Sequence, residues 1–316
     1  MQILSLPAMT SAAIYPENGV WVLGFFDGVH LGHQALLQAA RALAEVRHTF
    51  VGVWTFASLP KAEQRLTDSM ERAALLAEHG VQYIAIEKFA DVQQLSGEAF
   101  FRDILLAKLS PCALVCGFNF RFGYRGACSA EDLVRWGQEV QLPVQVVEPY
   151  LCGAVPVSST EIRTCIREGN MERAAQLLTR PYSISGTVSH GKALGRKLGF
   201  PTANLRLPEK KCAPAPGVYA SLVTLPGQER FLGVCNIGYR PTVNADKTDV
   251  TVETWLLDYS GDLYGKEITV ALYKKLRDEK KFDSLTALRD QVMEDGKAVR
   301  MYFEEKMKLN EDCHEP

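Results

Sequence analysis

Apolar residues in the first half of the chain fall into short runs of strand length, and these alternate with longer segments in which apolar residues recur at helical spacing. Strands that alternate with helices predict a mainly parallel sheet with helices on its faces. The predicted strands are 19–23, 49–56, 81–86, 113–116 and 144–147. The predicted helices are 31–46, 68–80, 96–109, a segment from residue 129, and a segment that opens at 158 and stops at 169.

The pattern changes at about residue 181, where short runs of β-branched and aromatic residues follow one another between turns. Antiparallel strands without intervening helices predict a small barrel or sandwich. Because 316 residues exceed the usual size of one domain, we predict an α/β domain at 1–180 and a β domain at 181–316 that ends in a long helix, 285–307. The predicted strands are 182–189, 217–225, 231–237, 250–257 and 267–276.

Composition and charge are those of an ordinary globular protein, with 47% hydrophobic and 23% charged residues and a formal net charge of −2. This balance gives no general reason to expect a nucleic-acid partner or a membrane surface. The eight cysteines are scattered without zinc spacing, which indicates reduced thiols. No long apolar run and no basic-then-apolar leader are present. We therefore expect a cytoplasmic protein that is monomeric or weakly self-associating.

Residues 24–34 join the first predicted strand to the first predicted helix through glycines and two histidines. A helix start attracts anions, because its first N–H groups lack partners and its dipole is positive there. His30 and His33 can present ring N–H groups on one side of that turn, while Gly28 lets a ligand approach the backbone. The alternative is a plain helix start with two exposed histidines. The helix end contributes about 0.3–1 kcal/mol, whereas millimolar binding needs about 4 kcal/mol, so a ligand site here requires further groups.

A second glycine-rich stretch, residues 117–126, follows the predicted strand 113–116. It combines aromatic residues with Asn119 and two arginines, a mixture that suits stacking on a flat ring beside a phosphate. The alternative is a surface loop with ordinary aromatic packing. Ligands of parallel sheets bind at the carboxyl ends of the strands, which is where this stretch begins.

Hydroxyl residues and an arginine open the predicted helix that begins at residue 158. Ser159 and Thr160 are adequately explained as helix caps. Arg163 lies one turn further along and would add a fork of donors to an anion held at the same helix end. Two helix starts, this one and the one at His30, would clamp one triphosphate from two sides.

The chain resembles the bifunctional bacterial riboflavin kinase/FAD synthetases over about residues 15–305, through the motifs GFFDGVHLGHQ, CGFNFRFG, SSTEIR and GKALGRKLGFPTANL. The resemblance implies a Rossmann-like nucleotidyltransferase module followed by a riboflavin kinase β-barrel. It also implies the reactions: with ATP and Mg²⁺, the barrel phosphorylates riboflavin to FMN, and the first module adenylylates FMN to FAD.

In the first module the resemblance implies that His30 and His33 stabilise charge on the ATP phosphates. Ser159, Thr160 and Arg163 would lie on the opposite side of those phosphates. Adenylyl transfer needs an in-line arrangement and charge neutralisation, so no nucleophilic side chain is required. The other nucleotide- or flavin-binding positions implied are Gly24, Phe26, Asp27, Gly28 and Asn119.

In the second module the neutral oxygens of Thr202 and Asn204 suit Mg²⁺, and the resemblance implies that both residues bind MgATP. A hairpin loop rich in turn residues is the alternative. The resemblance places Glu253 at the catalytic position, where a carboxylate orients or deprotonates the attacking hydroxyl, although spacing alone fits an exposed strand carboxylate equally well. Arg277 is the candidate flavin contact. The phosphate-loop positions are Gly191, Gly195 and Arg196.

The chain departs from the family pattern after the second predicted strand. The family usually carries an Asp-Pro-His-Pro segment there, within the flavin and ATP site, whereas this chain has FASLPK at 56–61 and a shorter connection. A smaller departure is Ala-Cys at 127–128, where the family usually has an acidic or amide residue. Both departures fall in the adenylylating module. Two alternatives therefore stand beside the bifunctional enzyme: a riboflavin kinase with a weakened or inactive first module, and a flavin- or nucleotide-binding regulator without turnover.

Overall fold

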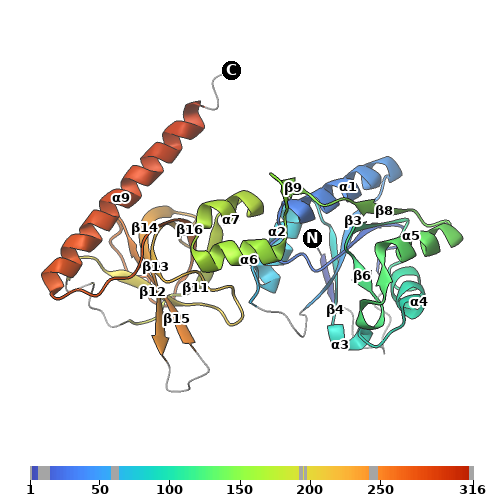
Figure 1. Cartoon of the computed structure of the whole chain (residues 1–316), viewed down its shortest axis with the longest axis horizontal. Helices are drawn as coiled ribbons and strands as arrows, with labels where there is room; N and C mark the ends of the chain where they lie inside the picture. The colour runs from blue at the N-terminus through green and yellow to red at the C-terminus, as the bar shows by residue number, and fades with distance from the viewer. Residues whose placement is uncertain are drawn as a thin grey trace. The chain divides into compact units, whose positions relative to one another are not determined.

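The computed structural model describes residues 2–5, 15–57, 64–191, 195, 198–241 and 248–312, without the side chains of 2–5, 240–241, 248–249 and 309–312. The chain divides into two compact units, Met1–Ser159 and Thr160–Pro316. Each unit contains one large sheet (Figure 1). The domain boundary that we predict at residue 180 stays a prediction.

A six-stranded sheet forms the centre of the first unit, in the order β1-β4-β3-β2-β5-β8 with all neighbours parallel. This confirms the predicted α/β fold. The edge strand β1 was not predicted, because its four residues pair with β4 alone and carry too short an apolar run. The strands are β1 (Gln2–Ser5), β2 (Val20–Leu23), β3 (Val51–Phe56), β4 (Tyr83–Glu87), β5 (Ala113–Gly117) and β8 (Val144–Val147).

The strand order reverses at β2. From β2 the chain runs outward through β3 and β4, then returns to the other side of β2 with β5 and β8. Such a reversal opens a crevice at the carboxyl ends of the two strands where it occurs. Residues 24–34 leave β2 at this edge and residues 117–126 leave β5, its hydrogen-bonded neighbour. The topology therefore brings the two predicted ligand-binding stretches to adjacent places.

Helices cover both faces of this sheet. Val20 and Val22 of β2 pack with the buried face of α1 on one side, and Trp21 and Leu23 pack with η1 and α5 on the other. The predicted helix 96–109 is α4 continued by the π-helical η1. The helices are α1 (Leu31–Arg47), α2 (Ser69–Glu78), α3 (Phe89–Val92), α4 (Gly97–Ala99), η1 (Phe100–Leu106), η2 (Tyr124–Gly126) and α5 (Ala130–Glu139). Two short hairpins are β6 (Arg121–Phe122) with β7 (Cys128–Ser129), and β9 (Leu151–Cys152) with β10 (Val155–Pro156).

An antiparallel sheet of six strands forms the second unit, in the order β11-β16-β13-β14-β15-β12. A bridge between Ser189 and Asn204 links the two ends of this order, so the sheet curls into the predicted barrel. Val299 of the terminal helix packs against Val218 and Val234 of the sheet. The strands are β11 (Tyr182–Thr187), β12 (Thr202–Arg206), β13 (Gly217–Thr224), β14 (Arg230–Pro241), β15 (Thr248–Leu256) and β16 (Glu267–Arg277). The helices are α6 (Ser159–Glu168), α7 (Met171–Leu178) and α9 (Leu285–Asp312).

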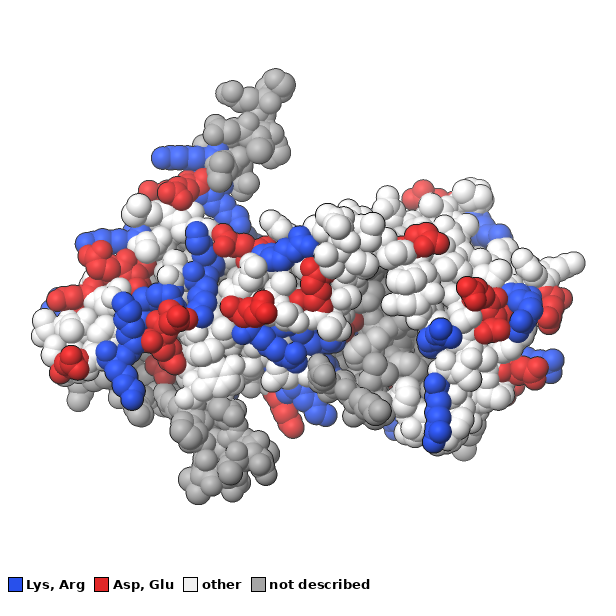
Figure 2. Space-filling view, viewed as in Figure 1, with Lys and Arg blue, Asp and Glu red and all other residues white. Residues whose placement is uncertain are grey.

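The surface mixes acidic and basic side chains in both units on the face shown in Figure 2. A net charge of −2 agrees with this mixture. Over the part of the chain that the structure describes, no helix combines the length and the apolar character that a membrane crossing requires. The cellular location, the absence of a nucleic-acid partner and the oligomeric state stay predictions.

Candidate active sites

The first candidate site is the turn between β2 and α1, where two histidine rings stack. Their centroids lie 3.7 Å apart and their planes are 18° from parallel. His30 is the N-cap residue of α1, and its Nδ1 accepts a hydrogen bond of 3.4 Å from the backbone N–H of His33. An accepting Nδ1 carries no proton, so the neutral ring of His30 has its N–H at Nε2. The structure thus places both histidines on the first turn of the helix, as their spacing predicts.

The imidazole of His33 is held in its neutral form. Burial, and then the nearby His30 and Arg72, lower the pKa of His33 well below its ordinary value. Its Nδ1 is buried and has no hydrogen-bond partner. A neutral ring can donate a hydrogen bond to a phosphate oxygen without first losing the hydration of a full charge.

Phe26 and Gly24 shape the same turn by packing. The Phe26 ring is fully buried, and its centroid lies 5.0 Å from that of His33. A Cβ added at Gly24 would lie 3.0 Å from the edge of the Phe26 ring. The Phe26 ring therefore leaves little room for a side chain at Gly24.

The backbone of the turn passes through the left-handed region at Gly28 (φ 85°) and at Val29 (φ 42°). Such a φ is unusual for a β-branched residue, so the surrounding contacts must hold it. The carboxylate of Asp27 accepts hydrogen bonds from the backbone N–H groups of Leu66 (2.9 Å) and Thr67 (3.1 Å). The hydroxyl of Thr67 in turn accepts from the Gly28 N–H at 3.1 Å. The described contacts of the Asp27 carboxylate therefore fix the turn.

The start of α6 is bonded directly to this turn. The Ser159 hydroxyl donates to the backbone carbonyl of Asp27 at 2.9 Å. Ser159, the last residue of the first unit, thus contacts the histidine turn, and the proposed clamp by two helix starts stays a prediction. Thr160 and Arg163 belong to the second unit, so their place on the opposite side of the phosphates stays a prediction.

A buried arginine that the sequence analysis missed lies at the same edge of the sheet. Arg72 of α2 donates to the carbonyl of Phe25 at 3.1 Å and to that of Phe56 at 2.9 Å, just beyond β2 and at the end of β3. Burial lowers its pKa to about 10, so it still carries a positive charge at neutral pH. The sequence held only a weak signal that Arg72 is buried. Arg72 precedes Leu76 by four residues, so the two side chains lie on the same face of α2, which is the buried face.

The loop after β5 divides its aromatic residues between solvent and core. Phe118 is 48% exposed and Asn119 is exposed beside it, whereas Phe122 is buried against Phe100. Phe118 and Asn119 are therefore available to a ligand, while Phe122 packs in the core.

The segment 58–63, which holds most of the departure from the family pattern, lies outside the described residues.

The second candidate site is a row of side chains across three strands of the barrel. The register of β12 and β15 pairs Asn204 with Glu253, and the register of β14 and β15 pairs Asn236 with Glu253. Paired residues of neighbouring strands point to the same face. The Nδ2 group of Asn204 donates to the Thr202 carbonyl at 3.1 Å. The barrel therefore brings together Thr202, Asn204 and Glu253, and adds Asn236, which the sequence analysis missed.

Two glycines of the preceding loop allow close packing beside this row. A Cβ at Gly191 would fall 2.5 Å from Oδ1 of Asn204, and one at Gly195 would fall 2.5 Å from the carbonyl oxygen of Phe200. Neither position has room for a side chain. Arg196 of the same loop lies outside the described residues.

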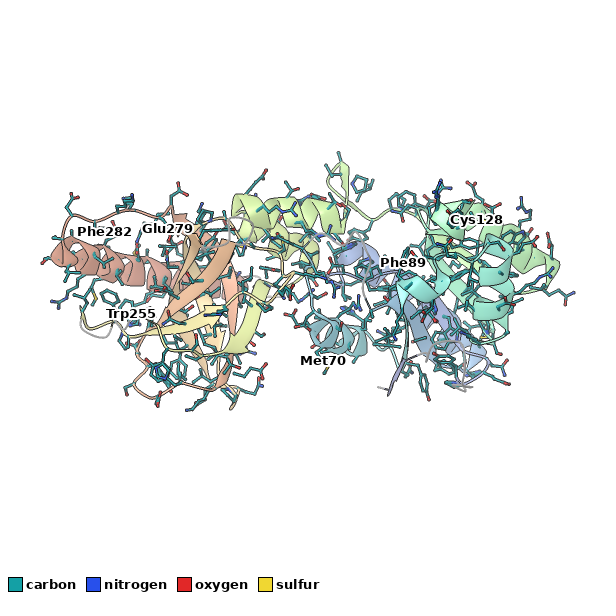
Figure 3. All side chains as sticks on the ribbon, turned by 90° about the horizontal axis from the view of Figure 1, so that it is seen from below. Met70, Phe89, Cys128, Trp255, Glu279 and Phe282 are labelled. Carbon is teal, nitrogen blue, oxygen red and sulfur yellow. The ribbon has the colours of Figure 1, made fainter. Side chains whose placement is uncertain are left out.

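Two cavities meet at Thr202. The larger, of about 740 Å³, is lined by Thr202, Glu253 and Arg277, among others, and Figure 3 labels three further lining residues, Trp255, Glu279 and Phe282. The smaller, of about 390 Å³, is lined by Thr202 and by residues 259–264. Both volumes lie in the range of small-molecule sites. The neutral hydroxyl of Thr202 thus lies on the shared wall of two cavities, with Glu253 in the larger one and Asp262 in the smaller one.

The parallel-sheet unit has a histidine-bearing helix start at its strand reversal, and the barrel has a carboxylate beside two adjoining cavities. Together they define a two-module transferase that acts on nucleotides. A FAD synthetase family model matches residues 13–161, and a riboflavin kinase family model matches residues 178–303.

Relatives and a solved structure match nearly the whole chain. The bifunctional riboflavin kinase/FMN adenylyltransferase of Escherichia coli K12 is 38% identical over 297 residues, which cover 91% of this chain and 94% of that protein. The protein with the same name from Listeria monocytogenes is 35% identical over 295 residues, covering 90% and 93%. A Streptococcus pneumoniae crystal structure, described as a macrolide-efflux protein, is 30% identical with a TM-score of 0.86, covering 94% of this chain and 98% of its own. The chain belongs to the family of bifunctional riboflavin kinase/FMN adenylyltransferases, which confirms the resemblance seen in the sequence.

Proposed function

We propose that this chain performs both reactions of its family: phosphorylation of riboflavin to FMN in the second unit and adenylylation of FMN to FAD in the first. The substrates are riboflavin, FMN and ATP. The observation that carries the kinase assignment is the position of Thr202 between two cavities, one of which holds Glu253. The family match over both units supports the pair of activities.

In the kinase, the larger cavity takes riboflavin and the smaller takes the adenine nucleotide, so the two substrates meet at Thr202. The primary hydroxyl of riboflavin forms a bond to the γ-phosphorus of ATP while the bond to the bridging oxygen breaks and ADP leaves. Glu253 lines the riboflavin cavity and receives the hydroxyl proton, or orients the hydroxyl until the proton departs.

The oxygens of Thr202 and Asn204 fit Mg²⁺. Mg²⁺ takes oxygen ligands and shares them with phosphates and water. Because the Nδ2 group of Asn204 already donates to the Thr202 carbonyl, its Oδ1 is the atom that remains for a cation. When bound, Mg²⁺ supplies charge neutralisation on the transferred phosphoryl group. Gly191 allows the phosphate loop to lie close enough to Asn204 for both to act on one nucleotide.

In the first unit, the phosphates of ATP bind at the start of α1, where His30 and His33 donate hydrogen bonds. A phosphate oxygen of FMN attacks the α-phosphorus, and pyrophosphate leaves with the electrons of the broken bond. The buried charge of Arg72 favours the anions at this edge. The remaining contacts that we propose are Gly24, Phe26, Asp27, Gly28, Asn119, Ser159, Thr160 and Arg163.

Incubation of the protein with riboflavin, ATP and Mg²⁺, with flavins separated by chromatography over time, tests the proposal. We expect FMN to appear first and FAD to follow. Accumulation of FMN without FAD would restrict the function to the kinase, an outcome that the missing Asp-Pro-His-Pro segment would explain. Flavin binding without either product would refute both activities.

A further inference from the structure

Two further cavities adjoin each other in the second unit, on residues that neither candidate site uses. The smaller, of about 440 Å³, lies between the barrel and the last part of α9, and most of its walls are apolar. Leu222, Leu232 and Tyr273 line it from three strands, and Phe303 and Met307 line it from α9. Its volume is in the range of small-molecule sites. We call it the apolar cavity.

The larger of the two, of about 670 Å³, lies among α7, β16 and α9, and charged side chains line it. Three of them are the cations Arg180, Lys274 and Lys306, and two are the carboxylates Glu172 and Glu305. The lining therefore has an excess of one positive charge, which favours an anionic ligand over a cationic one. We call it the charged cavity.

Two residues, Tyr273 and Lys306, line both cavities. Nζ of Lys306 lies 4.5 Å from the ring centroid of Tyr273 and 5.9 Å from that of Tyr302. Nζ of Lys274 lies 5.5 Å from the Tyr302 centroid. Such rings hold an ammonium group in place without neutralising it.

Neither of these two lysines forms an ion pair among the residues that the structure describes. Their ammonium groups therefore keep N–H donors for an anion, since each has three. Because Lys306 lines both cavities, an anion bound to it would lie where the two cavities meet.

The apolar cavity suits an alkyl chain better than a heteroaromatic ring. The nitrogens and carbonyls of a flavin or adenine ring lose free energy when they are buried without hydrogen-bond partners, and the apolar walls offer few. Arg300 and Glu304 also line this cavity, but both are exposed, and Arg300 is paired with Asp258 at 2.8 Å. An alkyl chain has no polar edge and gains from each CH₂ group that it buries. The flexible side chain of Met307 adapts to such a chain.

We propose that the two cavities together bind a single-chain amphiphile with an anionic head. The alkyl chain lies in the apolar cavity, and a phosphate or carboxylate head binds Lys306 and Lys274 in the charged cavity. Alkyl phosphates and fatty acids share this chemistry. The proposal goes beyond the two reactions of the family and does not depend on them.

This amphiphile site is separate from the proposed flavin cavity. Near its start, α9 lines the flavin cavity through Leu288, Val292 and Asp295, whereas residues 300–307 of the same helix line the amphiphile site. Among the described residues, none lines both. Saturating riboflavin should therefore leave the binding of an amphiphile unchanged, and displacement of the amphiphile by riboflavin would contradict a separate site.

Titration calorimetry of the full chain with decyl phosphate, below the concentration at which it forms micelles, tests the proposal without any turnover. We expect saturable binding at one site, about tenfold tighter than that of octyl phosphate because two more CH₂ groups are buried. Decanol and inorganic phosphate should each bind at least about tenfold more weakly than decyl phosphate. Equal binding of decanol would refute the anionic head, and equal binding of inorganic phosphate would refute the chain.

Decanoate, with the same titration, distinguishes the two possible heads, and the tighter of the two ligands identifies the preferred one. Vesicles of anionic phospholipid distinguish a free amphiphile from a membrane surface. Binding to vesicles without binding of monomeric decyl phosphate or decanoate would overturn the proposal.

Two pairs of variants on α9 locate the site. Lys306→Gln should weaken decyl phosphate binding about tenfold, the effect of losing a hydrogen bond to a charged group. Lys308→Gln is its control, because Lys308 is exposed and lines neither cavity. Met307→Ser should weaken binding about fivefold, whereas Met301→Ser should not, although the two methionines are similarly exposed, at 63% and 60%. Equal effects within either pair would refute the site, and circular dichroism checks that each variant is folded.

Discussion

The Ser159 hydroxyl donates a hydrogen bond of 2.9 Å to the backbone carbonyl of Asp27, across 132 positions of the chain. The carboxylate of the same aspartate accepts from the backbone N–H groups of Leu66 and Thr67. Asp27 thus connects, through hydrogen bonds, three segments that are distant in sequence: the histidine turn, the connection after β3, and Ser159. A site assembled before the ligand arrives loses little free energy in ordering itself during the reaction.

Replacement of Ser159 by alanine should slow FAD formation from supplied FMN about fivefold, the effect of losing one neutral hydrogen bond. FMN formation from riboflavin should not change, because Ser159 belongs to the first unit. Thr164→Ala is the control: it removes an exposed hydroxyl on the same helix, which donates to the Thr160 carbonyl. Separate assays of the two reactions measure the effect, and an equal loss of both would contradict independent sites.

His33→Asn should slow FAD formation about a hundredfold, as expected when a donor to developing charge is lost, and should leave FMN formation intact. The pKa of His33 lies well below its ordinary value, so we expect it to act as a neutral donor at pH 6–8. His48→Asn is the matched control, because His48 is exposed at the end of α1 with φ 51°, a backbone conformation that asparagine tolerates. Similar rates for both variants would remove His33 from the site.

Glu253→Gln should lower FMN formation about 100- to 10,000-fold, the range for loss of a general base. Adenylylation of supplied FMN should proceed at the wild-type rate. Glu267→Gln, an exposed carboxylate at the start of β16, is the control for charge removal on the barrel. Single-turnover phosphorylation measured by chromatography makes the comparison, and a wild-type rate for Glu253→Gln would exclude the proposed base.

Glu87 is an unusual residue at the end of β4, because its side chain is a carboxylate that is only 2% exposed and has one oxygen without a partner. Burial raises the pKa of Glu87 to about 7; Lys108 offsets part of the rise and Asp91 adds to it. Between pH 4.5 and about 7 the folded protein keeps a proton that the unfolded chain has released. The free energy of unfolding of the first unit should therefore fall as pH rises through this window and level off above it.

Glu87→Gln should remove most of this fall in the free energy of unfolding. The fall amounts to about 3 kcal/mol for the rise in the pKa of Glu87. Urea unfolding between pH 4.5 and 8, followed by tryptophan fluorescence, measures it, since Trp21 and Trp54 are buried in the first unit. Glu139→Gln, at the exposed end of α5, should keep the wild-type slope. An equal slope in wild type and Glu87→Gln would show that Glu87 titrates normally.

Features that depend on local spacing could be predicted from the sequence. His30 and His33 share a turn because they are three residues apart, and Glu253 points to one face of its strand because side chains alternate there. The glycine-rich turns and the helix starts follow from the same short-range chemistry. These signals were sufficient to propose both candidate sites from the sequence.

The missed residues depend on pairings that no local pattern records. Asn236 joins the candidate site because the register of β14 and β15 places it beside Glu253. Arg72 and Asp295 are charged residues on helices, for which exposure is the ordinary expectation. Each is buried because a partner from elsewhere in the fold satisfies it: two strand-end carbonyls for Arg72, and Arg277 for Asp295.

The position of Thr202 between two cavities has a consequence for inhibitor design. A molecule that joins a flavin-like ring to an adenine-like ring through a phosphate chain could occupy both cavities of the barrel at once. Once one ring is bound, the linker holds the other ring at a high effective concentration near the second cavity. The linked compound therefore binds far more tightly than either half. Its linker would have to pass the hydroxyl of Thr202. The distance between the two cavities past this hydroxyl therefore sets the length of the linker.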